Sequence, residues 1–435
     1  MRTTEYYKPE ELPEPEVLTM RQMLDEMEEV HVLAPLVRCS KLPFRHLVSM
    51  YETHVTHTPM MLAPEFSRAQ TARISDFASS HSERGVFWMK PRKTGGRQEE
   101  YDELGRSNAD SGLEANTFAS SSASSSRTTT VDRFPAVKSS RRSPSSLNPP
   151  SPDHRLVRGN LIAQFASNNG KSLADACEII SVLPETTTDE DEDNAKTGGF
   201  VGEEQAPVDE PVRSERLVDG VDLNCGCPQP WAYSEGIGSA LLRKPDLVAD
   251  MVKQVHARMG DDFAISVKIR VDDKPELTER LVQTAIHANV THLTIHGRTR
   301  HQPSTAPVSL PGIRFAVECA KGEVPCVGNG DIWEYGDVDD MRRVTGVKGV
   351  MAARGLLANP ALFAGYSSTP KHAVENFVEL ATSYGLAYNL FQRHVSYMLE
   401  STMSKHDRLY LNSLGSYSGI TDWLEDRGLQ FSGRC

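Results

Sequence analysis

The stretch FAISVKIRVDDKPELTERLVQTAIHANVTHLTIHGR, residues 263–298, contains the repeating unit that decides the fold. It starts with an apolar, β-branched run that predicts a strand at 263–270 and continues with an amphipathic stretch that predicts a helix at 277–288. A second strand-like run follows at 292–298. Strands that are apolar on both faces and alternate with helices are typical of a parallel sheet that helices cover.

The same unit extends along the chain in both directions. Strands are predicted at 32–37, 54–60, 161–167, 220–226, 263–270, 292–298, 324–330 and 349–355, and helices at 172–180, 246–259, 277–288, 312–321 and 337–345. The last four strands recur about every 25 to 30 residues, which suits a β/α unit. Eight such strands in series predict an α/β fold, a (β/α)8 TIM barrel that spans residues 31–365.

The rest of the chain divides into an N-terminal extension, a C-terminal helical region and two insertions. The extension is 1–30, and helical patterns at 375–388, 391–400 and 416–425 predict a small helical domain at 366–435. Segments at about 79–154 and 184–214 contain SSSASSSRTTT and ETTTDEDEDN and show no strand or helix period, so we expect disorder there. They are either lineage-specific loops or mispredicted coding sequence.

Composition excludes several classes of protein. The net charge of -12 argues against a uniformly basic nucleic-acid surface, although a local basic patch stays possible. Seven cysteines scattered over 435 residues do not resemble a secreted disulfide framework. The acidic start does not resemble a signal peptide, so none is expected there, and no apolar run approaches the roughly 20 residues that span a bilayer. We expect a soluble monomer with no membrane segment, cytoplasmic and/or nuclear.

Unusual polar residues lie where the predicted strands end, which is where TIM barrels build active sites. They are Gln164, Asn224, Cys225, Cys227, Lys268, Arg270, His296, Arg298, Asn329, Asp331 and Arg354. Each also has a structural explanation: Gln164 as a satisfied core amide, and His296 with Arg298 as a strand-end turn. Lys268 is harder to explain structurally, because burying an unpaired ammonium is costly. The CxC of Cys225 and Cys227 lacks the second Cys or His pair of a metal site, so no metal is expected.

Two glycine-bearing segments follow the last two strands. GNGDI at 328–332 and ARG at 353–355 let backbone amides approach an anion, and the loops after strands seven and eight commonly bind phosphate in this fold. A phosphate at one end and the Lys268 cation at the other would suit a flavin mononucleotide (FMN). Spacing does not separate a flavin from a sugar phosphate.

Several ordered motifs resemble the tRNA-dihydrouridine synthases. They are APLVRCSKLPFRHLV at 34–48, TPM at 58–60, AQFASN at 163–168, VDLNCGCPQPWA at 221–232, SVKIR, HGRTR, GNGDI, MAARGLLANPALF and, among the C-terminal helices, HVSYMLE at 394–400. The wording of SKLPFR and DLNCGCPQ is most similar to the eukaryotic branch that acts at positions 20a and 20b of the tRNA D-loop.

The resemblance implies a role for each matching residue. Cys227 would be the catalytic acid, and Asn224 would lie near the uracil. FMN would contact Pro35, Leu36, Val37, Gln164, Lys268 and His296, and its phosphate end would be held by Asn329, Gly330, Asp331, Ala353 and Arg354. Arg298, Arg393 and Arg408 are the further residues that we expect to bind substrate. Ala353 stands where the family often has glycine, and Gly328 where alanine is usual.

The chemistry that the resemblance implies is a reduction of the uracil C5=C6 bond. It needs a hydride to C6 from reduced FMN and a proton to C5, which a thiol keeps at neutral pH. NADPH or NADH would reload the flavin, although the chain has no GxGxxG fingerprint. The uridine would leave its stack at a cost of a few kcal/mol. Phosphate contacts need cations, and the local clusters are Arg393, His394, Lys405, His406 and Arg408, and Arg141, Arg142, Arg155 and Arg158.

Three alternatives stay open at this point. One is a flavin barrel oxidoreductase that reduces a free pyrimidine or a small enone without tRNA. Another is a redox-inactive RNA-binding barrel, and the third is a sugar-phosphate lyase or isomerase. The sequence does not decide which tRNA uridines are modified or whether NADPH or NADH is preferred.

Overall fold

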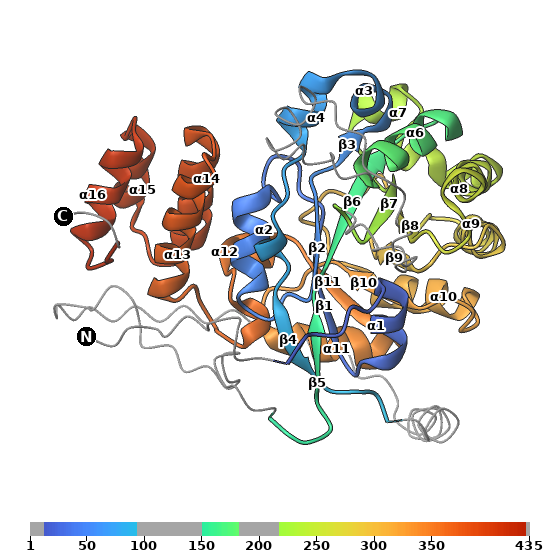
Figure 1. The fold of residues 1–435 in the computed structure, drawn as a ribbon, viewed down its shortest axis with the longest axis horizontal. Helices are drawn as coiled ribbons and strands as arrows, with labels where there is room; N and C mark the ends of the chain where they lie inside the picture. The colour runs from blue at the N-terminus through green and yellow to red at the C-terminus, as the bar shows by residue number, and fades with distance from the viewer. Residues whose placement is uncertain (1–12, 94–149, 182–216, 432–435) are drawn as a thin grey trace, which may run out of the picture.

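In the computed structural model, residues 13–93, 150–181 and 217–431 are described. Within them, eight parallel strands close into a barrel (Figure 1): β1 (Val30–Leu33), β2 (Val55–His57), β6 (Asn160–Ala166), β7 (Gly220–Cys225), β8 (Ile265–Arg270), β9 (Leu293–His296), β10 (Cys326–Asn329) and β11 (Gly349–Ala352). Each strand pairs with the next in chain order, and β11 pairs with β1 to close the ring. The predicted (β/α)8 fold is therefore confirmed.

Helices surround the strands of the barrel. They are α2 (Leu42–Ser49), α3 (Ala63–Arg68), α4 (Gln70–Asp76), α6 (Gly170–Ser181), α7 (Pro230–Ser234), α8 (Pro245–Met259), α9 (Pro275–His287), α10 (Leu310–Cys319), α11 (Tyr335–Thr345) and α12 (Arg354–Ala358), with 3-10 turns η2 (His81–Glu83), η4 (Gly238–Arg243) and η5 (Leu362–Ala364). Proline occupies the first turn of α8 and of α9, where its missing N–H costs nothing. The apolar stripe of α8, including Val248, Val252 and Val255, is buried against the sheet.

The second predicted strand, 54–60, is shorter in the structure. It ends at His57 and is followed by the two-residue strand β3 (Met61–Leu62), which pairs with β6. Pro59 lies between the two pieces and has no N–H to donate, which accounts for the break in the ladder.

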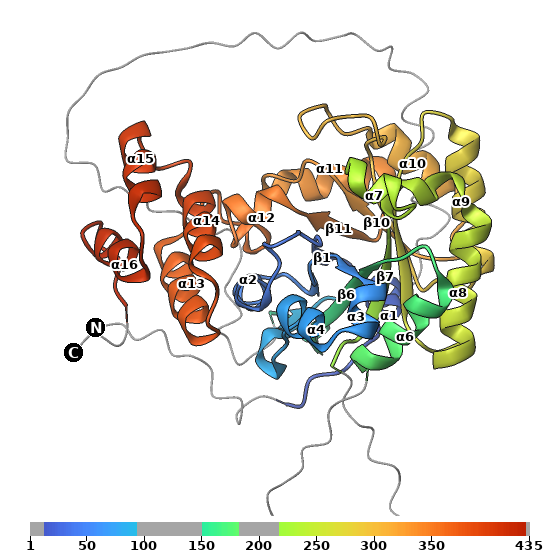
Figure 2. The ribbon, with the colours of Figure 1, turned by 90° about the horizontal axis from the view of Figure 1, so that it is seen from above.

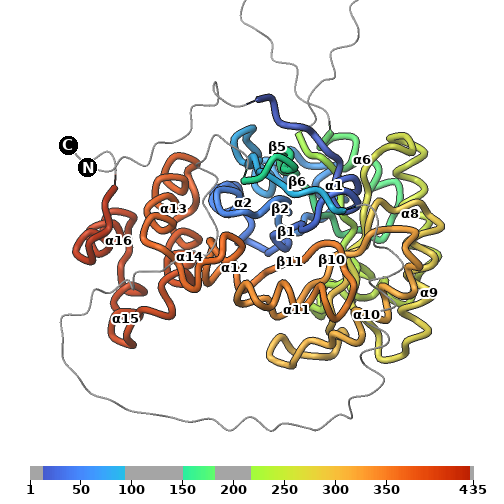
Figure 3. The backbone as a smooth tube through the Cα atoms, turned by 90° about the horizontal axis from the view of Figure 1, so that it is seen from below, coloured from blue at the N-terminus to red at the C-terminus, as the bar shows by residue number. Residues whose placement is uncertain are grey.

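The amino-terminal end of the barrel is closed by α1 (Met20–Glu26) and by an antiparallel pair, β4 (Val86–Met89) with β5 (Arg155–Arg158). Met23, Leu24 and Phe87 are fully buried and share a cluster with inward-facing residues of β1, β2, β6, β10 and β11. Figure 3, the view from below, shows α1 at this end of the ring. The interior of the barrel is therefore accessible from the carboxyl ends of the strands, and a ligand would enter from that side.

The pair of β4 and β5 corrects the predicted insertion at 79–154. Residues 79–93 were expected to be disordered, yet they form η2 and β4. The alternation of VFWM buries Phe87 and Met89, and Glu83 forms a fully buried ion pair with Arg45, 2.6 Å from Oε2 to Nε. Residues 150–154 of the first predicted insertion are also described, whereas 94–149 and 184–214 lie outside the described residues.

The C-terminal helices α13 (Lys371–Ser383), α14 (Tyr388–Leu399), α15 (Lys405–Ser413) and α16 (Tyr417–Glu425) lie beside the barrel next to α2 and α12 (Figures 1 and 2). Phe377 and Phe391 belong to the same continuous apolar cluster as the barrel. The helix predicted at 375–388 ends earlier, at Ser383, because Gly385 takes a left-handed conformation. Helix α15 was not predicted, and it buries Leu411 alone among its residues.

Candidate active site

The inside of the barrel becomes polar at the carboxyl ends of β7 to β10. Leu223, Val267 and Ile269 face outward into the core under the helices, so the alternate residues Asn224 and Lys268 face inward. The strand register places Asn224 opposite Lys268. It also places Asn329 opposite His296, so these predicted site residues converge on one rim.

A chain of hydrogen bonds runs from the barrel interior to Cys227. The buried carboxylate of Asp222 accepts from Gln164 Nε2 at 2.7 Å and from Ser266 Oγ at 2.7 Å. Gln164 Oε1 accepts from Asn224 Nδ2 at 2.8 Å, and Asn224 Oδ1 accepts from the backbone N–H of Cys227 at 2.9 Å. Burial raises the pKa of Asp222 to about 6. Asp222 was not among the predicted site residues.

Two cysteines of the CxC motif have opposite environments. Cys225 points into the apolar core, and burial raises its pKa well above the ordinary value. Cys227 is half-buried on the rim, where Gly238 packs against it so closely that a Cβ there would lie 2.8 Å from the Cys227 Cβ. Arg270 Nε donates to the carbonyl of Gly226 at 2.8 Å and fixes the same loop. Cys227 is thus the thiol of this pair that a substrate can reach.

Lys268 brings a cation into the barrel mouth. Its Nζ donates to Asn329 Oδ1 at 3.0 Å, and the Asn329 amide in turn donates to the carbonyl of Met351 at 2.9 Å. Burial lowers the pKa of Lys268 to about 8, although the nearby Asp222 carboxylate opposes this shift. Lys268 is therefore predominantly charged at neutral pH.

His296 is neutral in this environment. Burial, together with the neighbouring Lys268, Arg270, Arg298 and Arg354 cations, lowers its pKa to about 2. Its Nε2 lies 3.3 Å from Arg298 Nη1. Because a guanidinium can donate but not accept, Nε2 accepts and the ring proton resides on Nδ1.

The loops after β10 and β11 form a small cavity of about 90 Å³. Its lining includes His296, Asn329, Gly330, Ala353 and Arg354. Gly330 has a φ of 134°, and a Cβ on it would lie 2.6 Å from the Val308 side chain. Gly355 lies so close to the other loop that a Cβ on it would lie 2.0 Å from the carbonyl oxygen of Ile332. A side chain at either position would clash with these neighbours, so glycine is needed at both to keep the shape of the cavity.

Asp331 organises the cations of this cavity. Its Oδ2 accepts from Arg298 Nη2 at 2.5 Å, and its Oδ1 accepts from Arg354 Nη2 at 2.8 Å. Arg298 is 3% exposed and also donates from Nε to the carbonyl of Ala306 at 2.6 Å. Arg354 is 39% exposed at the side chain and lies over the ring of Trp333. The structure therefore gives Arg298, predicted to bind substrate, a buried position at the cavity wall.

The loop after β1 borders the same rim. The backbone N–H of Ala34 donates to the carbonyl of Ala352 at 2.9 Å, which places Pro35 and Leu36 next to the end of β11. Pro35 and Leu36 are half-buried, and Val37 is exposed.

The predicted RNA-binding cluster on the C-terminal helices is divided by the structure. Arg393 and Arg408 are exposed, and Arg408 Nη1 lies 3.8 Å from Glu400 Oε1. Arg393 lies near Cys39 at the rim, where its charge opposes the rise that burial causes in the pKa of the Cys39 thiol. His394 is buried instead, its Nε2 lies 3.1 Å from the carbonyl of Cys39, and burial lowers its pKa to about 4.

The second predicted basic cluster is also divided. Arg155 pairs with Glu16 and Glu26, and Arg158 pairs with Asp219, so these charges are already neutralised. Arg141 and Arg142 lie outside the described residues.

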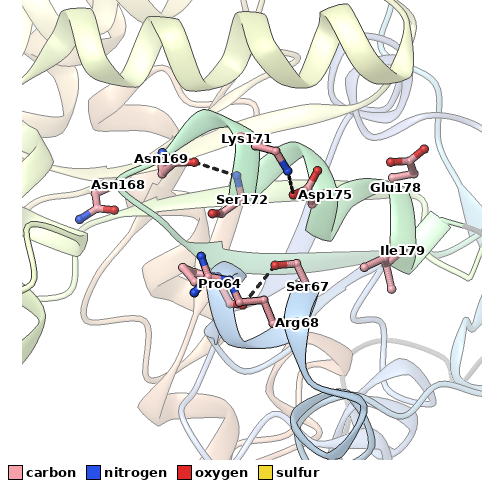
Figure 4. A pocket seen from close by; sticks show the side chains of 10 residues that line it. All are labelled: Pro64, Ser67, Arg68, Asn168, Asn169, Lys171, Ser172, Asp175, Glu178 and Ile179. Atoms are coloured by element: carbon pink, nitrogen blue, oxygen red, sulfur yellow. Dashed lines mark hydrogen bonds and ion pairs between the residues drawn. The ribbon is translucent and has the colours of Figure 1, made fainter.

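A larger cavity of about 710 Å³ lies elsewhere, between α3 and α6 on the outside of the strand ring (Figure 4). Its lining has no aromatic or sulfur-bearing side chain, and Lys171 there pairs with Asp175 at 2.8 Å. Among the described residues, no His, Cys, Asp and Glu side chains gather into a group that could hold a metal ion. None of the helices in the same residues is long and apolar enough to cross a bilayer.

Comparisons with known proteins match the sequence to a family. Residues 209–415 match the family model described as dihydrouridine synthase (Dus). The human protein named tRNA-dihydrouridine(20a/20b) synthase (NAD(P)+)-like is 31% identical over 409 residues, which cover 93% of this chain and 93% of the relative. The Schizosaccharomyces pombe tRNA-dihydrouridine(20a/20b) synthase (NAD(P)+) is 30% identical over 397 residues, covering 91% of this chain and 87% of the relative. The chain therefore belongs to the tRNA-dihydrouridine synthase family.

Proposed function

We propose that this protein reduces uridine to 5,6-dihydrouridine in the D-loop of tRNA, at positions 20a/20b, with FMN as cofactor and NADPH or NADH as reductant. The observation that carries the proposal is the convergence on one rim of Cys227, Lys268 and the small cavity after β10 and β11. Relatives whose names specify the 20a/20b reaction and NAD(P)+ align along more than nine-tenths of this chain.

The chemistry of the side chains at this rim fits FMN. Arg354 offers a partly exposed guanidinium beside glycine-shaped backbone, which suits a phosphate. The residues that would hold the phosphate end are Asn329, Gly330, Asp331, Ala353 and Arg354, with Asp331 acting through the two arginines that it orients. When bound, FMN supplies the hydride for uracil C6.

The ring end would meet Gln164, Lys268 and His296, with Pro35, Leu36 and Val37 alongside. Among the described residues, Lys268 Nζ makes one hydrogen bond, to Asn329, and an ammonium has three donors. Its charge would therefore stabilise negative charge on the ligand. His296 contributes a donor from Nδ1 and no charge, because its pKa lies far below neutrality.

Cys227 holds the proton that C5 of the uracil receives. Its position depends on Asn224, whose amide spans Gln164 and the Cys227 N–H. Asn224 lies opposite Lys268 and next to Cys227 on the rim, so it would border the space that a uracil enters.

The test is dihydrouridine formation on purified tRNA with NADPH, read by mass spectrometry. Cys227→Ala should keep its flavin absorbance and lose dihydrouridine, whereas Cys319→Ala, a change on the outer helix α10, should match the unaltered protein. Full turnover by Cys227→Ala would remove the thiol from the mechanism. Reduction of free uridine monophosphate at the rate of tRNA would instead support the free-pyrimidine alternative.

A further inference from the structure

An exposed aromatic pair follows the catalytic loop directly. Trp231 is 47% exposed and Tyr233 is 45% exposed, and both lie on the short helix α7, a few residues after Cys227. Burial of aromatic rings of this size is normally favourable, so exposed rings beside a reactive group indicate a surface that a ligand covers.

Arg300 lies on the face of Tyr233. Its guanidinium carbon is 3.6 Å from the centroid of the ring, the separation of a stacked cation–π contact. Arg300 follows β9 in the HGRTR motif and is half-buried. Within residues 13–93, 150–181 and 217–431, no carboxylate lies at ion-pair distance from this guanidinium.

One side chain fixes this pair relative to Cys227. Arg270 Nε donates to the carbonyl of Gly226, and Arg270 Nη1 donates to the carbonyl of Thr299 at 3.0 Å. Those carbonyls precede Cys227 and Arg300 respectively. Arg270 therefore holds the thiol loop and the stacked arginine at a set separation.

We propose that Tyr233 and Arg300 form a stacking platform for an unpaired RNA base next to the uridine being reduced. Flat aromatic faces and a planar guanidinium are the groups that bind unstacked bases. A uridine that leaves its stack also disrupts its neighbour, and stacking of that neighbour on protein offsets part of the cost. The unpaired positive charge of Arg300 favours an RNA partner over an apolar protein surface.

This inference rests on the proposed function, and binding measurements separate the two. Fluorescence anisotropy would compare intact tRNA with tRNAs that carry an abasic site on either side of the reduced uridine. For the unaltered protein, one abasic site should weaken binding about 10-fold, the usual value of one stacked base. Tyr233→Leu and Arg300→Ala should each bind intact tRNA about 10-fold more weakly than the unaltered protein does. The abasic site should not weaken the binding of either variant further.

The matched control is Arg314→Ala, because Arg314 is a surface arginine paired with Glu318 on the outer helix α10. It should bind both tRNAs as the unaltered protein does. Flavin content and the rate of flavin reduction by NADPH should be unchanged in Tyr233→Leu and Arg300→Ala, which shows that the fold and cofactor site survive. If the abasic site weakened tRNA binding by each variant as much as it weakens binding by the unaltered protein, the two losses would be additive. That result would overturn the platform. Absence of dihydrouridine with the unaltered protein would overturn the proposed function instead.

Discussion

Replacing Lys268 with methionine should make the ligand-free protein more stable near pH 7, although it removes a polar site residue. The structure holds this ammonium half-buried in the barrel mouth, with its pKa lowered from 10.5 to about 8. A lowered pKa in a base means that folding disfavours the charged form. Below pH 8 both the folded and the unfolded chain carry the proton, so the cost is fully present there. It disappears as the pH rises from about 8 to about 10.5.

The magnitude follows from the same shift. At 1.36 kcal/mol for each pKa unit the cost would be roughly 3 kcal/mol, and the remaining solvent contact of the side chain reduces it to about 2. Losing the hydrogen bond to Asn329 destabilises the variant by about 1 kcal/mol and offsets part of this gain. Because the entropy of unfolding grows with chain length, the net gain of about 1 kcal/mol corresponds to a rise of about 1 to 1.5 °C in Tm.

The assay is thermal unfolding of flavin-free protein at pH 7 and at pH 9.5, with Lys253→Met on the exposed face of α8 as the control. The Tm of Lys268→Met should be higher than that of the unaltered protein at pH 7, and the difference in Tm should be smaller at pH 9.5. Added FMN should raise the Tm of the unaltered protein more than that of Lys268→Met. A lower Tm than the unaltered protein at pH 7 would refute the reasoning, because it would show that the ammonium stabilises the empty barrel.

Three other changes test different parts of the molecule. Gly355→Ala should abolish flavin retention, because its Cβ would lie 2.0 Å from the Ile332 carbonyl; flavin absorbance after gel filtration measures this, and full retention would contradict it. Phe87→Ala should lower the free energy of unfolding by about 3 to 5 kcal/mol, measured by urea denaturation, because the ring is fully buried at the closed end of the barrel; a loss below about 1 kcal/mol would mean that β4 contributes little. Arg393→Ala with Arg408→Ala should weaken tRNA binding and reduce its salt slope by about 2, and an unchanged slope would place the RNA surface elsewhere.

The barrel strands could be predicted because each is an apolar run of nearly the right length. The strand predicted at 263–270 corresponds to β8 at Ile265–Arg270, and the one predicted at 349–355 begins where β11 begins. The local sequence pattern did not predict a strand whose partner strand is distant in the sequence. Strand β4 was missed because its partner β5 lies beyond a long polar segment, so the alternation of VFWM had no neighbouring strand to support it.

The site could be located but not completed from sequence. Strand ends identify Lys268 and Asn329, because TIM barrels build their active sites from polar residues at the carboxyl ends of the strands. Asp222 was missed, although it alternates with Asn224 on the same face of β7, a signal that could have indicated it. The burial of Arg298 could not be foreseen, since its partner Asp331 comes from another strand end.

The pairing of Met89 with Arg155 has a practical consequence for engineering. Met89 and Arg155 lie opposite each other in the antiparallel pair at the closed end of the barrel, away from Cys227. Closing a longer loop costs only about 0.6 kcal/mol for each doubling of its length. A fluorescent reporter or an affinity handle could therefore be grafted between these two residues while the mouth of the barrel keeps its shape.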